Sequence, residues 1–370
     1  MDRIEYQRVS FFMLDLIAGV FGAKDISGLR PDQIDLEQLY TIAEKNGLCA
    51  IVAYALKKAD IHHDKFRIAY AKSQQRNLLL DREFQRLRRE FNQANIRYLP
   101  LKGILLKSIY PSPCMREMTD IDILFFGSPE KVRTVMSNAG YSCIQYGKSN
   151  HDVYQKPPFF SVEMHRSLVD GSLFPALCQY FDELTYPFAD DDSLCLQMTK
   201  EQMYLHLIAH AYVHDTLAGT GLRTLLDINL YLSAYEDQMD MSYIRKELAK
   251  IDLDDYEAML RNLSKKLLTA DSMSPEEKEQ LDNYIFAGKY GNRSRYIQNR
   301  MKRIMSGVDK PSKLKYIRKR LSYNQKNIDN SPFFSKHPRL APLMYITRPI
   351  DAVITRPKMI IKEIKQMKNK

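Results

Sequence analysis

The sequence has few cysteines, and their spacing suits neither disulfides nor zinc. Its 370 residues contain five, an odd number, with no CxxC pair and no Cys/His pair at zinc spacing. We therefore expect reduced thiols rather than a disulfide framework or a cysteine-based zinc site. The five are Cys49, Cys114, Cys143, Cys178 and Cys195.

Long hydrophobic runs are also missing. The longest near the N-terminus, Phe11 to Gly22, is short and contains Asp15, and Asp2 and Glu5 precede it. A membrane helix needs about 20 apolar residues, and a signal peptide begins with a positively charged region. We expect neither feature, and hence a cytoplasmic protein. The sequence also lacks internal repeats and low-complexity segments.

The charge is divided unevenly along the chain. The net charge is +10, yet residues 289–370 hold 22 Lys and Arg against 4 Asp and Glu, a net +18. Residues 1–288 hold 33 basic and 41 acidic residues, a net −8. The pattern predicts an acidic body with a basic tail.

The basic tail has two interpretations. It could bind nucleic acid or an anionic membrane surface through basic residues interleaved with tyrosines, or it could be a solvated helical appendage. No DNA- or RNA-binding motif is visible, so a nucleic-acid contact would be mainly electrostatic. The residues concerned are Tyr316, Arg318, Lys319, Arg320 and Tyr323.

Composition and periodicity predict an α+β protein. Hydrophobic residues make up 45% and charged residues 27%, which is typical of a globular chain, and the length suggests two or three domains. We expect a small mixed β-sheet core flanked by helical regions on both sides. The predicted parts are a helical region at 1–78, the core at 79–197, a helical domain at 198–288 and the tail at 289–370.

Within the core, helices and strands alternate. A long amphipathic helix over 76–95 leads into the strand IRYLPLKG, followed by a short helix over 104–110. Next come a strand at 120–126, a helix at 129–139 and the three strands SCIQYG, HDVYQK and FFSVEMH. After Thr199 the spacing is helical again, with Gly219 and Gly221 separating two helices.

The segment TDIDILFF carries the clearest chemical signal. Side chains alternate along a strand, so Asp120 and Asp122 face one way while Ile121 and Ile123 face the core. Two adjacent carboxylates are costly unless a cation neutralises them or their pKa values rise. Hard oxygen ligands on a strand suit Mg²⁺.

FFSVEMH supplies a third carboxylate, because Glu163 shares a strand face with Ser161 and His165. Three acids on two strands can hold two divalent ions, an arrangement that supports phosphoryl-type transfer. Upstream, Lys102 and Gly103 lie where a strand ends and a helix begins, a place that favours phosphate groups.

These motifs resemble the nucleotidyltransferase superfamily, whose members share a glycine at the first strand-helix junction, an acid-x-acid strand and a third acid on a later strand. More narrowly, YLPLKGILLKSIYPSPCMREMTDIDILF with SVEMHRSL looks like the uncharacterised bacterial nucleotidyltransferase family with KG, R-x-x-x-D-I-D and E-x-H motifs. The resemblance extends over about residues 10–290. It implies a polymerase-β-like fold.

The resemblance also implies residue roles. Gly103 matches the phosphate-loop glycine, Asp120 and Asp122 the metal-binding pair, and Glu163 the third acid, which positions or activates the acceptor. The superfamily usually places Gly or Ser after its glycine, whereas this chain has Ile104. Lys102 or Arg116 is therefore expected to supply part of the phosphate contact.

Several of these residues have competing interpretations. Lys102 could be a solvated residue at a strand end. Arg116 could pair with Asp120 or Glu117 within the scaffold, and His165 could be a core histidine as readily as a second-shell or acceptor group.

Three histidines lie at i, i+4 and i+8 in HLIAHAYVH: His206, His210 and His214. Their spacing allows zinc binding, but apolar neighbours and the absence of an HExxH glutamate favour packing. The family resemblance instead implies that His210, together with Arg223 and Asp227, buttresses or closes the cleft.

The leading hypothesis is a transferase that moves a nucleoside monophosphate from a triphosphate, such as ATP, to an acceptor hydroxyl. It would use two Mg²⁺ ions, or Mn²⁺, on Asp120, Asp122 and Glu163. One alternative is a degenerate module that binds nucleotide or a partner without catalysis. Another is a toxin-antitoxin or defence enzyme that modifies RNA or protein; a small molecule or sugar is also open as acceptor.

Overall fold

A computed structural model describes residues 2–30, 34–189, 194–289, 291–305, 328 and 331–355. The chain divides into two compact units. The first comprises Met1–Val213 with Thr220–Tyr290, and the second His214–Gly219 with Gly291–Lys370. The tail residues singled out above, from Tyr316 to Tyr323, lie outside the described residues.

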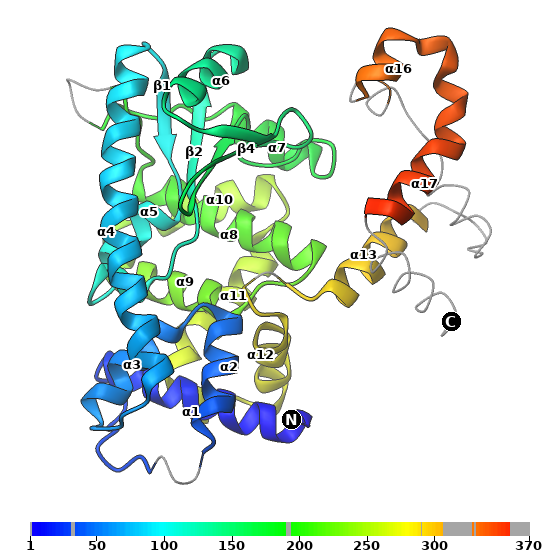
Figure 1. The fold of residues 1–370 in the computed structure, drawn as a ribbon. Helices are drawn as coiled ribbons and strands as arrows, with labels where there is room; N and C mark the ends of the chain where they lie inside the picture. The colour runs from blue at the N-terminus through cyan, green and yellow to red at the C-terminus, as the bar shows by residue number, and fades with distance from the viewer. Residues whose placement is uncertain are drawn as a thin grey trace. The chain divides into compact units, whose positions relative to one another are not determined.

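The first unit begins with four helices (Figure 1). Asp35 caps α2 by accepting hydrogen bonds from the backbone of Glu37 and Gln38, and Gly47 ends it in the left-handed conformation (φ 66°). The last of the four begins at Asp64 rather than at Arg76, and the middle of this long helix contains residue 78, where a domain boundary was expected. The bounds are α1 Arg3–Val20, α2 Leu36–Asn46, α3 Cys49–Lys58 and α4 Asp64–Gln93.

A five-stranded sheet follows, in the order β1-β2-β5-β4-β3. Only the β2–β5 pair is parallel, and the other neighbours are antiparallel. The predicted strands and the small mixed sheet are thus confirmed, and the fold is α+β. The bounds are β1 Arg97–Pro100, β2 Ile121–Phe126, β3 Ser142–Gln145, β4 His151–Lys156 and β5 Phe160–His165.

Short helical segments connect the strands. Ser128 caps α6 by accepting from the backbone of Lys131, and Pro129 occupies its first turn. The segments are α5 Gly103–Leu106, η2 Lys107–Ile109, η3 Pro113–Met115 and α6 Pro129–Asn138.

The two faces of the sheet contact different cores. One face packs against the second half of α4, which runs along the sheet in Figure 1, and against α6. Its side chains include Ile121, Ile123, Val162 and Met164, the apolar positions of β2 and β5. The opposite face contributes Leu124 to a larger helical core, and by alternation it also carries Asp122 and Glu163. The acids therefore face the helical part of the unit.

Helices from both ends of the first unit share that larger core, which contains buried residues of α1–α3 and of α8–α12. The remaining helices are α7 Pro175–Asp182, α8 Lys200–Leu217, α9 Leu222–Tyr235, η4 Glu236–Gln238, α10 Met241–Lys250, α11 Asp254–Lys266, η5 Leu267–Ser272 and α12 Pro275–Ala287.

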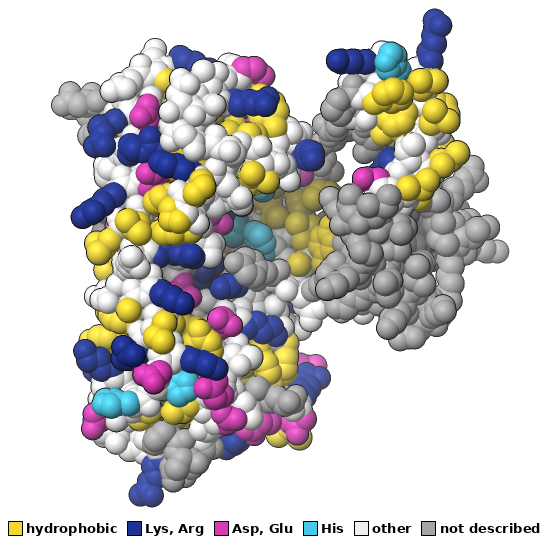
Figure 2. Space-filling view, viewed as in Figure 1, with side chains coloured by type: hydrophobic (Ala, Val, Ile, Leu, Met, Phe, Trp, Pro, Cys, Tyr) yellow, Lys and Arg dark blue, Asp and Glu magenta, His cyan; other side chains and the backbone are white. Residues whose placement is uncertain are grey.

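The described part of the second unit is helical. Arg295 pairs with Asp215 at 2.9 Å, which ties α13 to the segment that this unit takes from the end of α8. Farther on, the unit exposes large apolar side chains, and Figure 2 shows a hydrophobic patch with basic side chains beside it. No helix among the described residues is both long and apolar enough to cross a bilayer. The bounds are α13 Arg293–Met305, α16 Pro332–Lys336, η6 Pro338–Leu343 and α17 Met344–Thr355.

Gly221, which precedes α9, lies directly against another segment. A Cβ atom there would approach the backbone carbon of Gly288 to 2.6 Å and the backbone nitrogen of Lys289 to 2.9 Å. We expect Gly221→Ala to lower the free energy of unfolding by about 1 to 3 kcal/mol, because backbone atoms must move to make room. Urea denaturation measures this free energy of unfolding. Gly28→Ala is the control, since a Cβ at Gly28 would meet nothing within 4 Å; equal losses in both variants would contradict the prediction.

Candidate active site

The parallel pairing of β2 with β5 places two of the predicted acids side by side. In this register Asp122 lies opposite Glu163, and Leu124 lies opposite His165. Asp120 precedes β2 and is also partly buried. The two acidic motifs, separated by about 40 residues in sequence, thus meet on one sheet face.

Electrostatics links the three carboxyl groups. Burial and the neighbouring carboxylates Asp122 and Asp120 raise the pKa of Glu163 to about 7. Burial and Asp122 likewise raise the pKa of Asp120. For Asp122 burial acts in the same direction, but Lys102, His165 and Arg116 outweigh it and lower the pKa well below its usual range. The site therefore keeps one firmly ionised carboxylate beside two that hold protons more tightly.

Lys102 lies between the sheet and α8. Its Nζ is 3.5 Å from Oδ2 of Asp122 and 3.0 Å from Nε2 of His210, and its side chain is 14% exposed. The predicted residues Lys102 and His210 therefore meet at the acids. Lys102 also has a positive φ of 40°, a conformation that costs a non-glycine residue about 1 to 3 kcal/mol and is concentrated at functional sites.

Arg116 forms a buried ion pair with Asp227 of α9, rather than with Asp120 or Glu117. Its Nε and Nη2 donate to the two carboxylate oxygens at 2.9 and 2.8 Å, and the hydroxyl of Tyr110 donates to the same carboxylate at 2.7 Å. The guanidinium is therefore held by the scaffold, although its charge still contributes to the low pKa of Asp122.

Gly103 leaves room for this guanidinium. A Cβ atom at Gly103 would lie 2.7 Å from Nη1 of Arg116, closer than side-chain atoms normally approach. The next residue, Ile104, is 8% exposed and belongs to the core between the sheet and α4. Its side chain is thus directed into that core, so the departure from the superfamily pattern does not put a bulky group over the acids.

Arg223 acts at the edge of the site. Its Nη1 donates to the backbone oxygen of Glu117 at 2.9 Å, and its charge opposes the rise in the pKa of Asp120. The Glu117 carboxylate accepts from the backbone of Ala50. The loop before β2 is therefore fixed by contacts from α9 and α3.

His165 and a residue that the sequence analysis missed, His151, adjoin the acids. Nε2 of His165 is 3.1 Å from Oδ1 of Asp122 and 3.7 Å from Oε2 of Glu163. His151 begins β4 directly opposite His165, and its Nε2 is 3.6 Å from the same oxygen of Glu163. The available signal was the hairpin itself, because antiparallel pairing of HDVYQK with FSVEMH aligns the two histidines.

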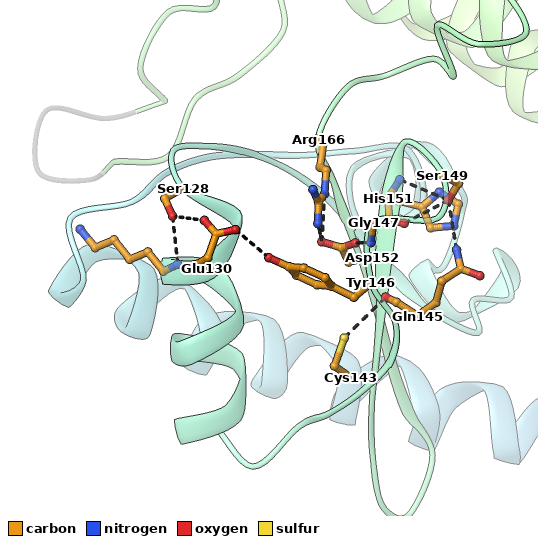
Figure 3. Close-up of polar contacts among 11 residues, drawn as sticks. Ser128, Glu130, Cys143, Gln145, Tyr146, Gly147, Ser149, His151, Asp152 and Arg166 are labelled. Carbon is orange, nitrogen blue, oxygen red and sulfur yellow. Dashed lines mark hydrogen bonds and ion pairs between the residues drawn. The ribbon is translucent and has the colours of Figure 1, made fainter. Parts of the chain in front are cut away.

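A clamp beside these histidines fixes the hairpin (Figure 3). Asp152 is fully buried and accepts from Nε and Nη2 of Arg166 at 3.1 and 2.7 Å and from the backbone of Gly147 at 2.7 Å. Tyr146, whose ring lies under the guanidinium of Arg166, donates to Glu130 at 3.1 Å.

The histidines of α8 do not form a metal cluster among the described residues. His206 is 2% exposed, and burial, followed by the charges of Lys102 and His165, lowers its pKa to about 3. His210 contacts Lys102, and His214 belongs to the second unit. The packing interpretation of this helix face is therefore favoured over zinc.

Comparison with known proteins identifies the class. Residues 32–269 match the family described as uncharacterised nucleotidyltransferase, and the chain belongs to that family. No curated protein matches. Among solved structures, the chain is similar to an antigenic nucleotidyltransferase-like protein from Paracoccidioides brasiliensis, with 14% identity and a TM-score of 0.32 over 50% of this chain and 89% of that one.

The Arg116–Asp227 pair should matter for stability. Both side chains are less than 10% exposed, so Asp227→Asn leaves a buried guanidinium without its counter-charge. We expect the free energy of unfolding to fall by about 3 to 5 kcal/mol, measured by urea denaturation. The control is Arg67→Gln, which breaks an exposed pair with Asp64 and should cost less than about 1 kcal/mol. Similar losses in both would contradict the prediction.

Glu163 should make the stability of the metal-free protein depend on pH. Its pKa is about 7 in the folded state against an ordinary 4.5, so between these values the folded state binds more protons than the unfolded one. The contribution of Glu163 to stability therefore falls as the pH rises through this window.

Glu163→Gln has no such proton. We expect its free energy of unfolding, relative to that of the unsubstituted protein, to increase from pH 4.5 to pH 8 in the presence of a chelator. Urea denaturation at several pH values measures the difference. Parallel pH profiles for the two proteins would show that burial and the neighbouring acids do not perturb Glu163.

Proposed function

We propose that the protein transfers a nucleoside monophosphate from a nucleoside triphosphate to an acceptor hydroxyl. The observation that carries the proposal is the juxtaposition of Asp122 and Glu163 across the parallel β2–β5 pair, with Asp120 linked to them electrostatically. Membership of a nucleotidyltransferase family supports the reaction class.

The acidic residues fit a divalent cation. Two of the three carboxyl groups have raised pKa values because they are buried beside other acids, and a bound cation would offset that repulsion. Asp120, Asp122 and Glu163 would hold Mg²⁺ or Mn²⁺, which prefer oxygen ligands. Such ions would neutralise charge on the phosphates as it develops during transfer.

The remaining steps follow from side chains of this chain. The acceptor oxygen attacks the α-phosphorus, the bond to the bridging oxygen breaks and pyrophosphate leaves. Glu163, ionised beside a bound cation, would accept the proton of the acceptor hydroxyl. Lys102 provides a cationic group beside the acids for the phosphate charge.

The helical side of the site completes the proposal. Arg116 and Asp227 fix the loop before β2 against α9, and Arg223 holds the same loop at Glu117. His210 positions the ammonium group of Lys102. The acceptor would approach between this face of the sheet and α8. An experiment must identify its chemical class, which could be RNA, protein, a sugar or another small molecule.

Asp122→Asn should abolish Mg²⁺-dependent binding of triphosphate. In a thermal-shift assay, a ligand at 100 times its Kd stabilises a fold by about 2.7 kcal/mol, so one nucleoside triphosphate should raise the melting temperature only when Mg²⁺ is present. We expect the rise to vanish in Asp122→Asn and to persist in Glu183→Gln, an exposed acid on the surface. Far-UV circular dichroism should show that both variants are folded.

Triphosphates labelled on the α-phosphate then test transfer. Label that becomes attached to RNA, protein or a small molecule names the acceptor class, and the label should disappear with Asp122→Asn. Retained transfer in that variant would refute the assigned site. No thermal shift with any triphosphate would instead favour a binding module without catalysis.

A further inference from the structure

Two imidazole nitrogens lie near one carboxylate oxygen. Nε2 of His151 and Nε2 of His165 lie 3.6 and 3.7 Å from Oε2 of Glu163. The ligand atoms of these three residues all lie within 4.8 Å of one another. This group shares only Glu163 with the acidic set, which also contains Asp120 and Asp122. It offers two imidazole nitrogens and one carboxylate, whereas the acidic set offers carboxylates alone.

The separations suit direct coordination of one ion. Zinc binds histidine nitrogen and carboxylate oxygen at about 2.0 to 2.2 Å, and two such ligands at a tetrahedral angle lie about 3.4 Å apart. The observed distances of 3.6 and 3.7 Å exceed this value by a few tenths of an ångström. The ligand atoms of the two histidines lie within 4.8 Å of each other, so a shift of the rings toward Glu163 and toward each other would close the site around an ion.

Of the two histidines, His165 already has one contact, from its Nε2 to Oδ1 of Asp122 at 3.1 Å. Nδ1 of each ring is buried and has no hydrogen-bond partner among the described residues. A neutral imidazole can offer the lone pair of its Nε2 to a metal ion. Binding would replace the contact of His165 with Asp122, which keeps Lys102 as a partner.

The protein also holds the two histidines in place. His151 and His165 are register partners, and the residues that follow them, Asp152 and Arg166, form the clamp of Figure 3. This ion pair, buried at Asp152, fixes the backbone of both strands next to the rings. The ion pair thus supports the backbone segments that carry the two histidines.

We propose that His151, Glu163 and His165 form a second metal site, selective for an imidazole-preferring divalent ion such as Zn²⁺. Two nitrogen ligands and one carboxylate match the ligand set of open zinc sites, whereas Mg²⁺ prefers oxygen. The site shares Glu163 with the proposed nucleotide site, and so extends that proposal without depending on nucleotide transfer.

Equilibrium dialysis with Zn²⁺ tests the site. The full-length protein is first freed of metal with a chelator and then dialysed against Zn²⁺ in excess Mg²⁺, with nucleotide absent. We expect one Zn²⁺ per chain. His151→Ala and the more conservative His151→Gln should weaken binding more than about 100-fold, because loss of residues that merely support a ligand already costs 10- to 100-fold.

Two controls separate this site from its surroundings. Asp120→Asn removes a neighbouring charge but no ligand, so it should weaken Zn²⁺ binding far less than the His151 variants. His62→Ala, at an exposed histidine, should leave binding unchanged. Absence of Zn²⁺ binding in excess Mg²⁺, or undiminished binding by both His151 variants, would overturn the inference. Since nucleotide is absent, neither outcome bears on the thermal-shift test of nucleotide binding.

Discussion

Charge neutralisation around the β2–β5 pair is the constraint on which the site depends. The parallel register brings Asp122 and Glu163 together on a partly buried face, and adjacent carboxylates in such a place repel each other. At Asp122 this repulsion is offset by the positive charge of Lys102 and by a hydrogen bond with His165. Glu163 is buried beside Asp122 and Asp120, which is why its pKa rises and why the face is suited to bind cations.

The helical part of the first unit supports this arrangement from the opposite side. Arg116 reaches from the loop before β2 to Asp227 on α9, and Gly103 is small enough to let the guanidinium pass. The glycine that matches the phosphate loop by family resemblance thus also makes room for a structural ion pair. The two requirements do not conflict, because Ile104, the residue that departs from the superfamily pattern, is packed into the other core.

Much of the fold could be predicted from the sequence. Alternation in TDIDILFF and FFSVEMH identified the two acidic strands and the faces of their side chains, and the mixed sheet between helical regions is confirmed. The partner of Arg116 was not predictable, since Asp227 is more than 100 residues away and the nearer acids Asp120 and Glu117 were equally plausible. His151 was missed because a histidine in a short strand does not indicate a site until the register of that strand with its neighbour is known.

The sequence by itself determined the strands of the core, the acidic motifs and the family resemblance, because alternation and motif order are local properties. Only the tertiary structure decided which residues meet: the parallel register joining Asp122 to Glu163, the approach of Lys102 to His210, and the alignment of His151 with His165. These contacts depend on chain packing over long sequence separations. They cannot be predicted from the order of the residues alone.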